Sequence, residues 1–179
     1  MGPFDPDLLG AMLRECRTAR GAPAKGKALE DLVQHVLTSI PSVELFARDV
    51  IDLDGTQEVD LVFSHYQSLS FVPIHDVTII TECKNERSKT SSEQITRFAA
   101  KLRARNVRTG LFVTYAGLAG KRRPVTSAHA AVRDELSSGI SIIVVTAAEL
   151  AAQSDADQLT KFLSRRLLEL ITIRGYLSI

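Results

Sequence analysis

Two short apolar segments in the second half of the chain constrain its fold more than any other feature. Residues 109–115 (TGLFVTY) and 140–146 (ISIIVVT) have the length of strands, and the second is apolar at almost every position. A strand of that kind is typical of a sheet that is covered on both faces. A segment of helical length, residues 125–136, separates the two strands. The pattern indicates helices packed on both sides of a sheet.

The rest of the chain supplies further helices and strands in an order that fits such a sheet. Apolar residues at steps of three and four predict amphipathic helices over residues 26–40, 92–102 and 155–173. Alternating patterns predict strands over residues 43–53, 58–63 and 77–84. We therefore expect an α/β fold in which helices flank a mixed central sheet. Residues 26–151 form its core, residues 1–25 an N-terminal extension with a short helix, and residues 152–179 a C-terminal helix.

Several classes of protein are excluded by the composition. No apolar run approaches the roughly 18 residues of a membrane span, and the N-terminus lacks the basic and apolar regions of a signal peptide. The two cysteines, Cys16 and Cys83, provide neither a disulfide framework nor a zinc cluster. The four histidines show no metal-ligand spacing. We expect a cytoplasmic protein with no membrane partner.

Three ionisable residues occur on two consecutive predicted strands, and their presence there requires a chemical explanation. Asp60 points away from the apolar face of its strand, and Glu82 and Lys84 project to one side of the next strand. Mg²⁺ prefers oxygen ligands, which the carboxylates of Asp60 and Glu82 and the main-chain carbonyl of Cys83 would supply. Lys84 would orient the attacking water and stabilise phosphate charge. The alternative is a solvated face with a cross-strand ion pair.

These residues resemble a known nuclease signature. Asp60 followed by Glu82-Cys83-Lys84 is similar to the motif of the PD-(D/E)xK nucleases. Its flanking elements have counterparts in the opening helix of residues 26–33 (GKALEDLV), in Gln94 to Phe98 (QITRF), which resembles the QxxxY/F element, and in residues 109–151, which resemble the trailing half of the Mrr-type restriction endonuclease domain. The resemblance covers residues 26–151 and implies a restriction-endonuclease-like, three-layer α/β/α fold.

The resemblance also implies roles for two residues outside the short motif. Glu30 on the opening helix becomes an additional metal ligand, and Gln94 becomes a catalytic residue that holds Lys84 or the attacking water. Each has an ordinary alternative, because a glutamate suits the start of a helix and a glutamine can simply pack there. The chain departs from the family in having Val59 where proline is common. Residues 64–76 form an insertion of unassigned purpose.

The charges of the chain are segregated, although they nearly cancel to a net +1. Residues 43–82 carry eight acidic residues against one basic, whereas residues 85–123 carry ten basic residues against two acidic. A basic surface beside an acidic metal site is the pattern expected for contact with phosphates, with solvated helix faces as the alternative. The candidate DNA-binding residues form what we call the basic rim: Lys89, Arg97, Lys101, Arg105, Lys121, Arg122 and Arg123.

The sequence thus predicts an Mg²⁺-dependent deoxyribonuclease, with Mn²⁺ as a substitute. The resemblance implies that it serves restriction, anti-phage defence or repair. Two alternatives remain open: a catalytically silent subunit on the nuclease fold that binds nucleic acid or serves as a scaffold, and an RNA-directed nuclease. Residues 1–25 and 152–179 are too few for a separate recognition domain, so we expect a homodimer or a protein partner that supplies target recognition. An apolar stripe on the C-terminal helix fits either self-association or packing on the core.

Overall fold

The structure, a computed structural model, describes residues 2–66, 72–74, 76–121 and 126–176. Within these residues the helices are α1 (Pro6–Thr18), α2 (Ala22–Leu37), α3 (Ser92–Ala104), α4 (Ser127–Ser137), α5 (Ala147–Ala151) and α6 (Ala156–Ile173). The strands are β1 (Val43–Ile51), β2 (Glu58–His65), β3 (Thr78–Lys84), β4 (Thr109–Thr114) and β5 (Ser141–Thr146). The predicted α/β fold with a mixed central sheet is confirmed, and its layers fit a three-layer α/β/α arrangement.

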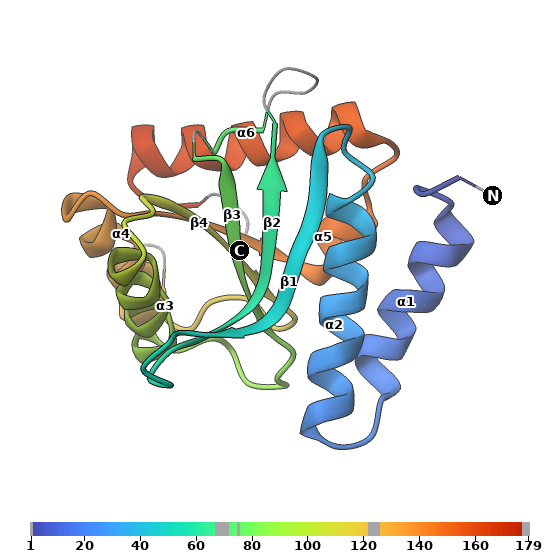
Figure 1. The fold of residues 1–179 in the computed structure, drawn as a ribbon, viewed down its shortest axis with the longest axis horizontal. Coiled ribbons are helices and arrows are strands. Elements are labelled where there is room, and N and C mark those ends of the chain that lie inside the picture. The colour runs from blue at the N-terminus through green and yellow to red at the C-terminus, as the bar shows by residue number, and fades with distance from the viewer. Residues whose placement is uncertain (1, 67–71, 75, 122–125, 177–179) are drawn as a thin grey trace.

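The five strands form a single mixed sheet in the order β1-β2-β3-β4-β5. The first three strands pair antiparallel, and β3, β4 and β5 pair parallel. Helices α1 and α2 lie on one side of the sheet and α3 and α4 on the other, while α6 crosses one end of it (Figure 1). The parallel half is the part of the sheet where α3 and α4 serve as crossovers.

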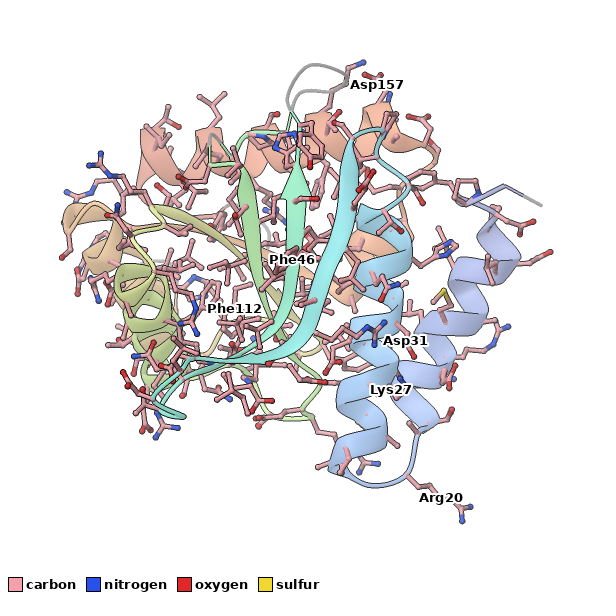
Figure 2. All side chains as sticks on the ribbon, viewed as in Figure 1. Arg20, Lys27, Asp31, Phe46, Phe112 and Asp157 are labelled. Atoms are coloured by element: carbon pink, nitrogen blue, oxygen red, sulfur yellow. The ribbon has the colours of Figure 1, made fainter. Side chains whose placement is uncertain are left out.

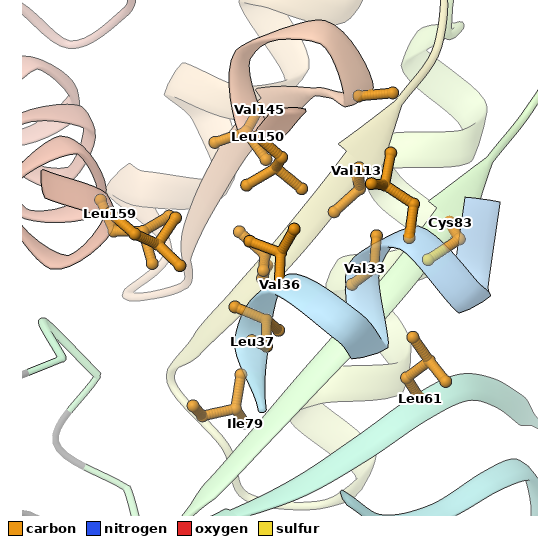
Figure 3. Packing of buried hydrophobic residues seen from close by; sticks show 14 of the residues in the cluster. Val33, Val36, Leu37, Leu61, Ile79, Cys83, Val113, Val145, Leu150 and Leu159 are labelled. Atoms are coloured by element: carbon orange, nitrogen blue, oxygen red, sulfur yellow. The ribbon is translucent and has the colours of Figure 1, made fainter. Parts of the chain in front are cut away.

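The first hydrophobic core lies between the sheet and α2. It contains the apolar face of α2 and the inward residues of β2, β3, β4 and β5. Strand β1 contributes one buried residue, Val43. Figure 3 shows this packing for Val33, Val36, Leu37, Leu61, Ile79, Cys83, Val113, Val145, Leu150 and Leu159. The alternation predicted for β2 is confirmed, because Val59, Leu61 and Phe63 are fully buried.

The second core lies on the opposite face of the sheet, under α3 and α4. Phe112 of β4, labelled in Figure 2, packs edge-to-face on Phe98 of α3 with ring centroids 5.6 Å apart. Ile95, Ala99 and Leu102 extend this contact along the helix. One face of α3 thus packs against the sheet. Side chains on its other faces project past the sheet edge or into solvent.

Both terminal helices pack on the core. Leu9 and Cys16 of α1 are buried against α2, and Leu159 and Leu163 of α6 join the first core. The C-terminal stripe is only partly covered, since Ile171, predicted to belong to it, is 55% exposed. Within the described residues, no helix has both the length and the apolar character needed to span a membrane.

Several element boundaries differ from those predicted, among them the starts of α2 and β3. Helix α2 begins at Ala22 and not at Gly26, because Pro23 suits the first turn and Gly21 takes a positive φ of 86° before it. Strand β3 begins at Thr78, and Val77, predicted to be in the strand, is 77% exposed. The insertion of residues 64–76 lies partly outside the described residues.

Candidate functional site

Strands β2 and β3 bring Asp60, Glu82 and Lys84 to one side of the sheet. The antiparallel ladder runs from Ser64 paired with Thr78 to Leu61 paired with Thr81, and Asp60 and Glu82 are the next residues on their strands. Since side chains alternate along a strand, these carboxylates share the face of Ile80, which lies in the second core under α3. The three residues of the predicted motif therefore converge.

Asp60 is held by the main chain of the neighbouring strand. Its Oδ2 accepts a hydrogen bond of 2.6 Å from the amide of Cys83. Burial and the negative charge of Glu82 raise the pKa of Asp60 from 3.8 to about 6, against the opposing effects of this hydrogen bond and of the charges of Lys84 and Lys101. A positive charge placed beside this carboxyl would favour its ionised form.

Glu82 is the most enclosed acidic side chain of the site. It is only 5% exposed, and its two oxygens contact different lysines. Lys84 Nζ lies 2.7 Å from Oε1, and Lys101 Nζ lies 2.6 Å from Oε2. A buried carboxylate needs such partners, because removal from water strongly disfavours its charge.

The two lysines come from different elements. Lys84 lies on β3 with Glu82, whereas Lys101 lies in the last turn of α3. Burial alone would lower the pKa of Lys84, but the charge of Glu82 and its hydrogen bond outweigh burial, so the pKa is raised. Lys84 is therefore a protonated, positively charged group at neutral pH, suited to contact with phosphate or water oxygen.

Glu30 approaches the same region from α2. It is partly buried, and Arg48 of β1 lies 3.8 Å from its carboxylate. Burial and then the charge of Asp60 raise the pKa of Glu30. The thiol of Cys83 is also affected: burial, followed by the charges of Asp60, Glu30 and Glu82, raises its pKa well above the usual value. All three carboxylates thus act electrostatically on the Cys83 thiol.

Gln94 contacts residues other than those the resemblance implies. Its side chain accepts a hydrogen bond of 2.8 Å from the Ser91 amide and completes a capping box at the start of α3. Its Nε2 donates to Glu86 at 3.1 Å. These contacts match the ordinary alternative of a residue that stabilises a helix start. They do not bring Gln94 to Lys84.

The basic rim divides into residues with different surroundings. Lys89, Arg97 and Lys121 are exposed, although Arg97 pairs with Glu93 at 2.5 Å on its own helix. Lys101 belongs to the carboxylate site, and Arg105 donates to the main-chain oxygen of Gln57 at 3.0 Å. Arg122 and Arg123 lie outside the described residues.

The donor atoms fit a hard divalent cation in kind, but they are not assembled around one position. Asp60, Glu82 and the Cys83 carbonyl provide oxygen ligands, and Glu30 lies nearby; Mg²⁺ commonly uses one or two protein carboxylates with waters and phosphate oxygens. In the described part of the chain, however, no group of three or more His, Cys, Asp or Glu side chains is arranged to hold a metal ion. The two ammonium groups occupy the oxygens of Glu82 instead.

Two residues that shape the site were missed by the sequence reasoning. The sequence predicts Lys101 only as a phosphate contact. Its pairing with Glu82 depends on where α3 lies along the sheet, and no local spacing indicates that. Asn85 follows Lys84 and donates to the main-chain oxygens of Cys16 at 2.9 Å and Lys25 at 2.7 Å. Nothing local in the sequence predicts that contact.

Comparison with known proteins adds no family to this picture. No protein-family model matches the chain, and a search of curated proteins finds no match.

Proposed function

We propose that the chain is a metal-dependent nuclease of the PD-(D/E)xK type that hydrolyses phosphodiester bonds in DNA. One observation carries the proposal: Asp60, Glu82 and Lys84 lie together where β2 and β3 stop pairing, with Asp60 fixed by the Cys83 amide at 2.6 Å and Lys84 on Glu82 at 2.7 Å. A solvated sheet face would expose these groups. Here Glu82 is buried and the pKa of Asp60 is raised to about 6, which is the kind of perturbation found at functional sites.

Each residue has a defined part in this proposal. Asp60 and Glu82 hold the cation through carboxylate oxygens, and Glu30 adds negative charge from α2. Lys84 orients the attacking water and offsets charge on the phosphate. A bound Mg²⁺ or Mn²⁺ supplies charge stabilisation at the phosphate and the leaving oxygen. Gln94, given its contacts with Ser91 and Glu86, positions α3 and through it Lys101.

DNA is the proposed substrate because of the charge beside the site. Exposed Lys89, Arg97 and Lys121 follow the motif strand in the chain, and basic side chains near a metal site are suited to contact phosphates on either side of the scissile bond. Restriction, anti-phage defence and repair are the proposed settings, with a homodimer or a protein partner providing target recognition.

A plasmid-nicking assay tests the proposal. Supercoiled DNA is incubated with the chain in Mg²⁺, Mn²⁺ or EDTA, and with Asp60→Asn and Lys84→Met variants. We expect cleavage that requires metal and falls at least about 100-fold in each variant. Glu58→Gln is the matched control, since Glu58 is an exposed carboxylate on the same strand. Cleavage that survives both site variants would refute the assignment of the site.

One observation favours a second candidate, a nuclease-fold module that binds nucleic acid without cutting it. Both oxygens of Glu82 contact lysines, and these lysines neutralise the carboxylate without a metal. Binding of duplex DNA by the wild-type chain, with no cleavage in any of the metals, would support this candidate. An RNA duplex and a single-stranded RNA run in parallel distinguish an RNA-directed nuclease.

A further inference from the structure

Glu82 is held by two lysines that come from different elements. Lys84 lies two residues after Glu82 on β3 and is the lysine of the proposed motif. Lys101 reaches Glu82 from α3 and has no part in that motif. A lysine side chain is a flexible four-carbon stem, and that of Lys101 is 19% exposed. Its ammonium can therefore leave Glu82 for solvent without movement of the strand or of the helix.

The contact of Lys101 lies on the carboxylate that a cation would need. Its Nζ is 2.6 Å from Oε2 of Glu82, and at that distance an ammonium proton occupies one of the two lone pairs of the oxygen. A cation bound to the same oxygen would lie close to the ammonium, and the two positive charges would repel each other. The positive charge of Lys101 also acts on Asp60, the second proposed ligand, so a cation approaching both carboxylates is repelled by Lys101.

We propose that Lys101 is a positioning residue that competes with the divalent cation for Glu82. The inference rests on the proposed function and deepens it by naming what controls occupancy of the metal site. Without metal, Lys101 neutralises Glu82 and keeps the carboxylate in place. With a cation held by Asp60 and Glu82, the ammonium of Lys101 would leave Oε2, and Lys84 would remain the lysine of the site.

A competitive role and a purely structural role predict opposite effects on metal affinity. If Lys101 competes, its removal leaves Glu82 accessible and the site more negative, so the affinity for metal rises. If Lys101 only supports the fold, its removal disturbs Glu82, so the affinity for metal falls or stays the same. Affinity is measured without DNA, which makes the readout independent of cleavage.

The test is titration calorimetry of Mn²⁺ into wild type, Lys101→Met and Lys101→Gln. We expect Lys101→Met to bind on the order of tenfold more tightly, because one positive charge next to the site is lost. Lys101→Gln can still donate a hydrogen bond to Glu82 and is expected to bind with intermediate affinity. It also serves as the second variant if Lys101→Met does not fold. Lys161→Met is the matched control: Lys161 makes an ion pair of the same 2.6 Å with Asp157, but on the exposed side of α6.

The outcomes separate this inference from the proposed function. If wild type binds Mn²⁺ and cuts DNA, but neither Lys101 variant binds Mn²⁺ more tightly than Lys161→Met does, the competition is refuted and the nuclease stands. If wild type neither binds Mn²⁺ nor cuts DNA, both proposals fail. A crystal structure of the wild-type chain with Mn²⁺ gives an independent check. Lys101 Nζ should lie beyond hydrogen-bond distance of Oε2, and an unbroken contact beside a bound Mn²⁺ would overturn the inference.

Discussion

The amide of Cys83 donates a hydrogen bond of 2.6 Å to the carboxylate of Asp60. The contact lies directly after Leu61 and Thr81, the last ladder pair of β2 and β3. A side chain thus satisfies a main-chain donor where the strands stop pairing. Burial and then the negative charge of Glu82 raise the pKa of Asp60 to about 6, whereas this hydrogen bond lowers it. The end of the β2–β3 ladder is therefore where the main-chain contact of Asp60 and its repulsion from Glu82 occur together.

The raised pKa of Asp60 predicts how stability depends on pH. Between 3.8 and about 6 the folded chain retains a proton that the unfolded chain releases. The free energy of unfolding therefore decreases as pH rises through this range, and the loss is complete above it. Asp60→Asn keeps the hydrogen-bond acceptor but cannot ionise, so it lacks this loss.

Thermal unfolding in EDTA at pH 4, 5, 6 and 7 checks this prediction. We expect the Tm of Asp60→Asn to rise relative to wild type, by several degrees in total, with most of the change between pH 4 and pH 6. A Tm difference that does not change with pH would contradict it. Glu58→Gln, an exposed carboxylate on β2, should follow wild type throughout.

Asn85 connects the end of the strand that carries Lys84 to α1 and α2 through hydrogen bonds. Its Nδ2 donates to the oxygens of Cys16 and Lys25, and Cys16 lies in the last turn of α1, where main-chain oxygens lack helical partners. We expect Asn85→Ala to lower the free energy of unfolding by about 1–3 kcal/mol, measured by urea denaturation. Asn85→Asp should cost more, since it places a carboxylate against two carbonyls. Ser88→Ala, at an exposed position nearby, should have little effect.

The sequence predicts most of the fold because hydrophobic periodicity is a local property. The burial of Val59, Leu61 and Phe63 follows from alternation along one strand. Helix boundaries are less predictable. The sequence predicts a helix start at Gly26 because glycine disfavours helix interiors. The start at Ala22 is set instead by Gly21 and Pro23.

The site is predictable only where its residues share an element or adjacent strands. Asp60, Glu82 and Lys84 could be placed together from strand alternation and the order of the strands. The pairing of Lys101 with Glu82 depends on how far along the sheet α3 lies. That distance is set by Phe98 and Leu102 packing in the second core, which no local pattern encodes. The sequence predicts Gln94 on the helix where it lies. Its capping role depends on its hydrogen bonds with Ser91.

The exposed members of the basic rim predict a salt dependence for DNA binding. In a Lys84→Met background, the triple variant Lys89→Ala, Arg97→Ala, Lys121→Ala should lower the slope of log affinity against log salt by up to about 3, since each phosphate contact contributes roughly 0.9. Fluorescence anisotropy with a labelled duplex over a range of salt concentrations measures this slope.

A control triple variant separates specific contacts from net charge. Lys161, Arg165 and Arg174 are exposed and lie on α6 or at its C-terminal end. Their replacement by alanine removes the same charge. If this control lowers the slope as much as the rim variant does, the rim is not the phosphate-binding surface.

Arg166 joins the C-terminal helix to the rest of the domain through a buried charge network. Its guanidinium, 3% exposed, pairs with Glu149 of α5 and with Glu169 one turn away. It also lies over the rings of Phe162, at 5.2 Å, and Tyr176, at 5.7 Å. Tyr176 in turn accepts a hydrogen bond of 3.0 Å from the amide of Val144 in β5. These contacts tie α6 to the parallel edge of the sheet.

Removing Arg166 should therefore be among the most destabilising single changes at the C-terminus. Arg166→Met preserves length and apolar packing, but it leaves the partly buried Glu149 without its cation and Glu169 with only the exposed Arg165, at an expected cost of about 3–5 kcal/mol. Arg133→Met is the matched control, because the pair of Arg133 with Asp134 is exposed and such a pair contributes at most about 1 kcal/mol. Urea denaturation of both variants against wild type gives the comparison. Equal losses in the two variants would mean that packing of Leu159, Leu163 and Leu170, and not the charge network, holds α6 on the domain.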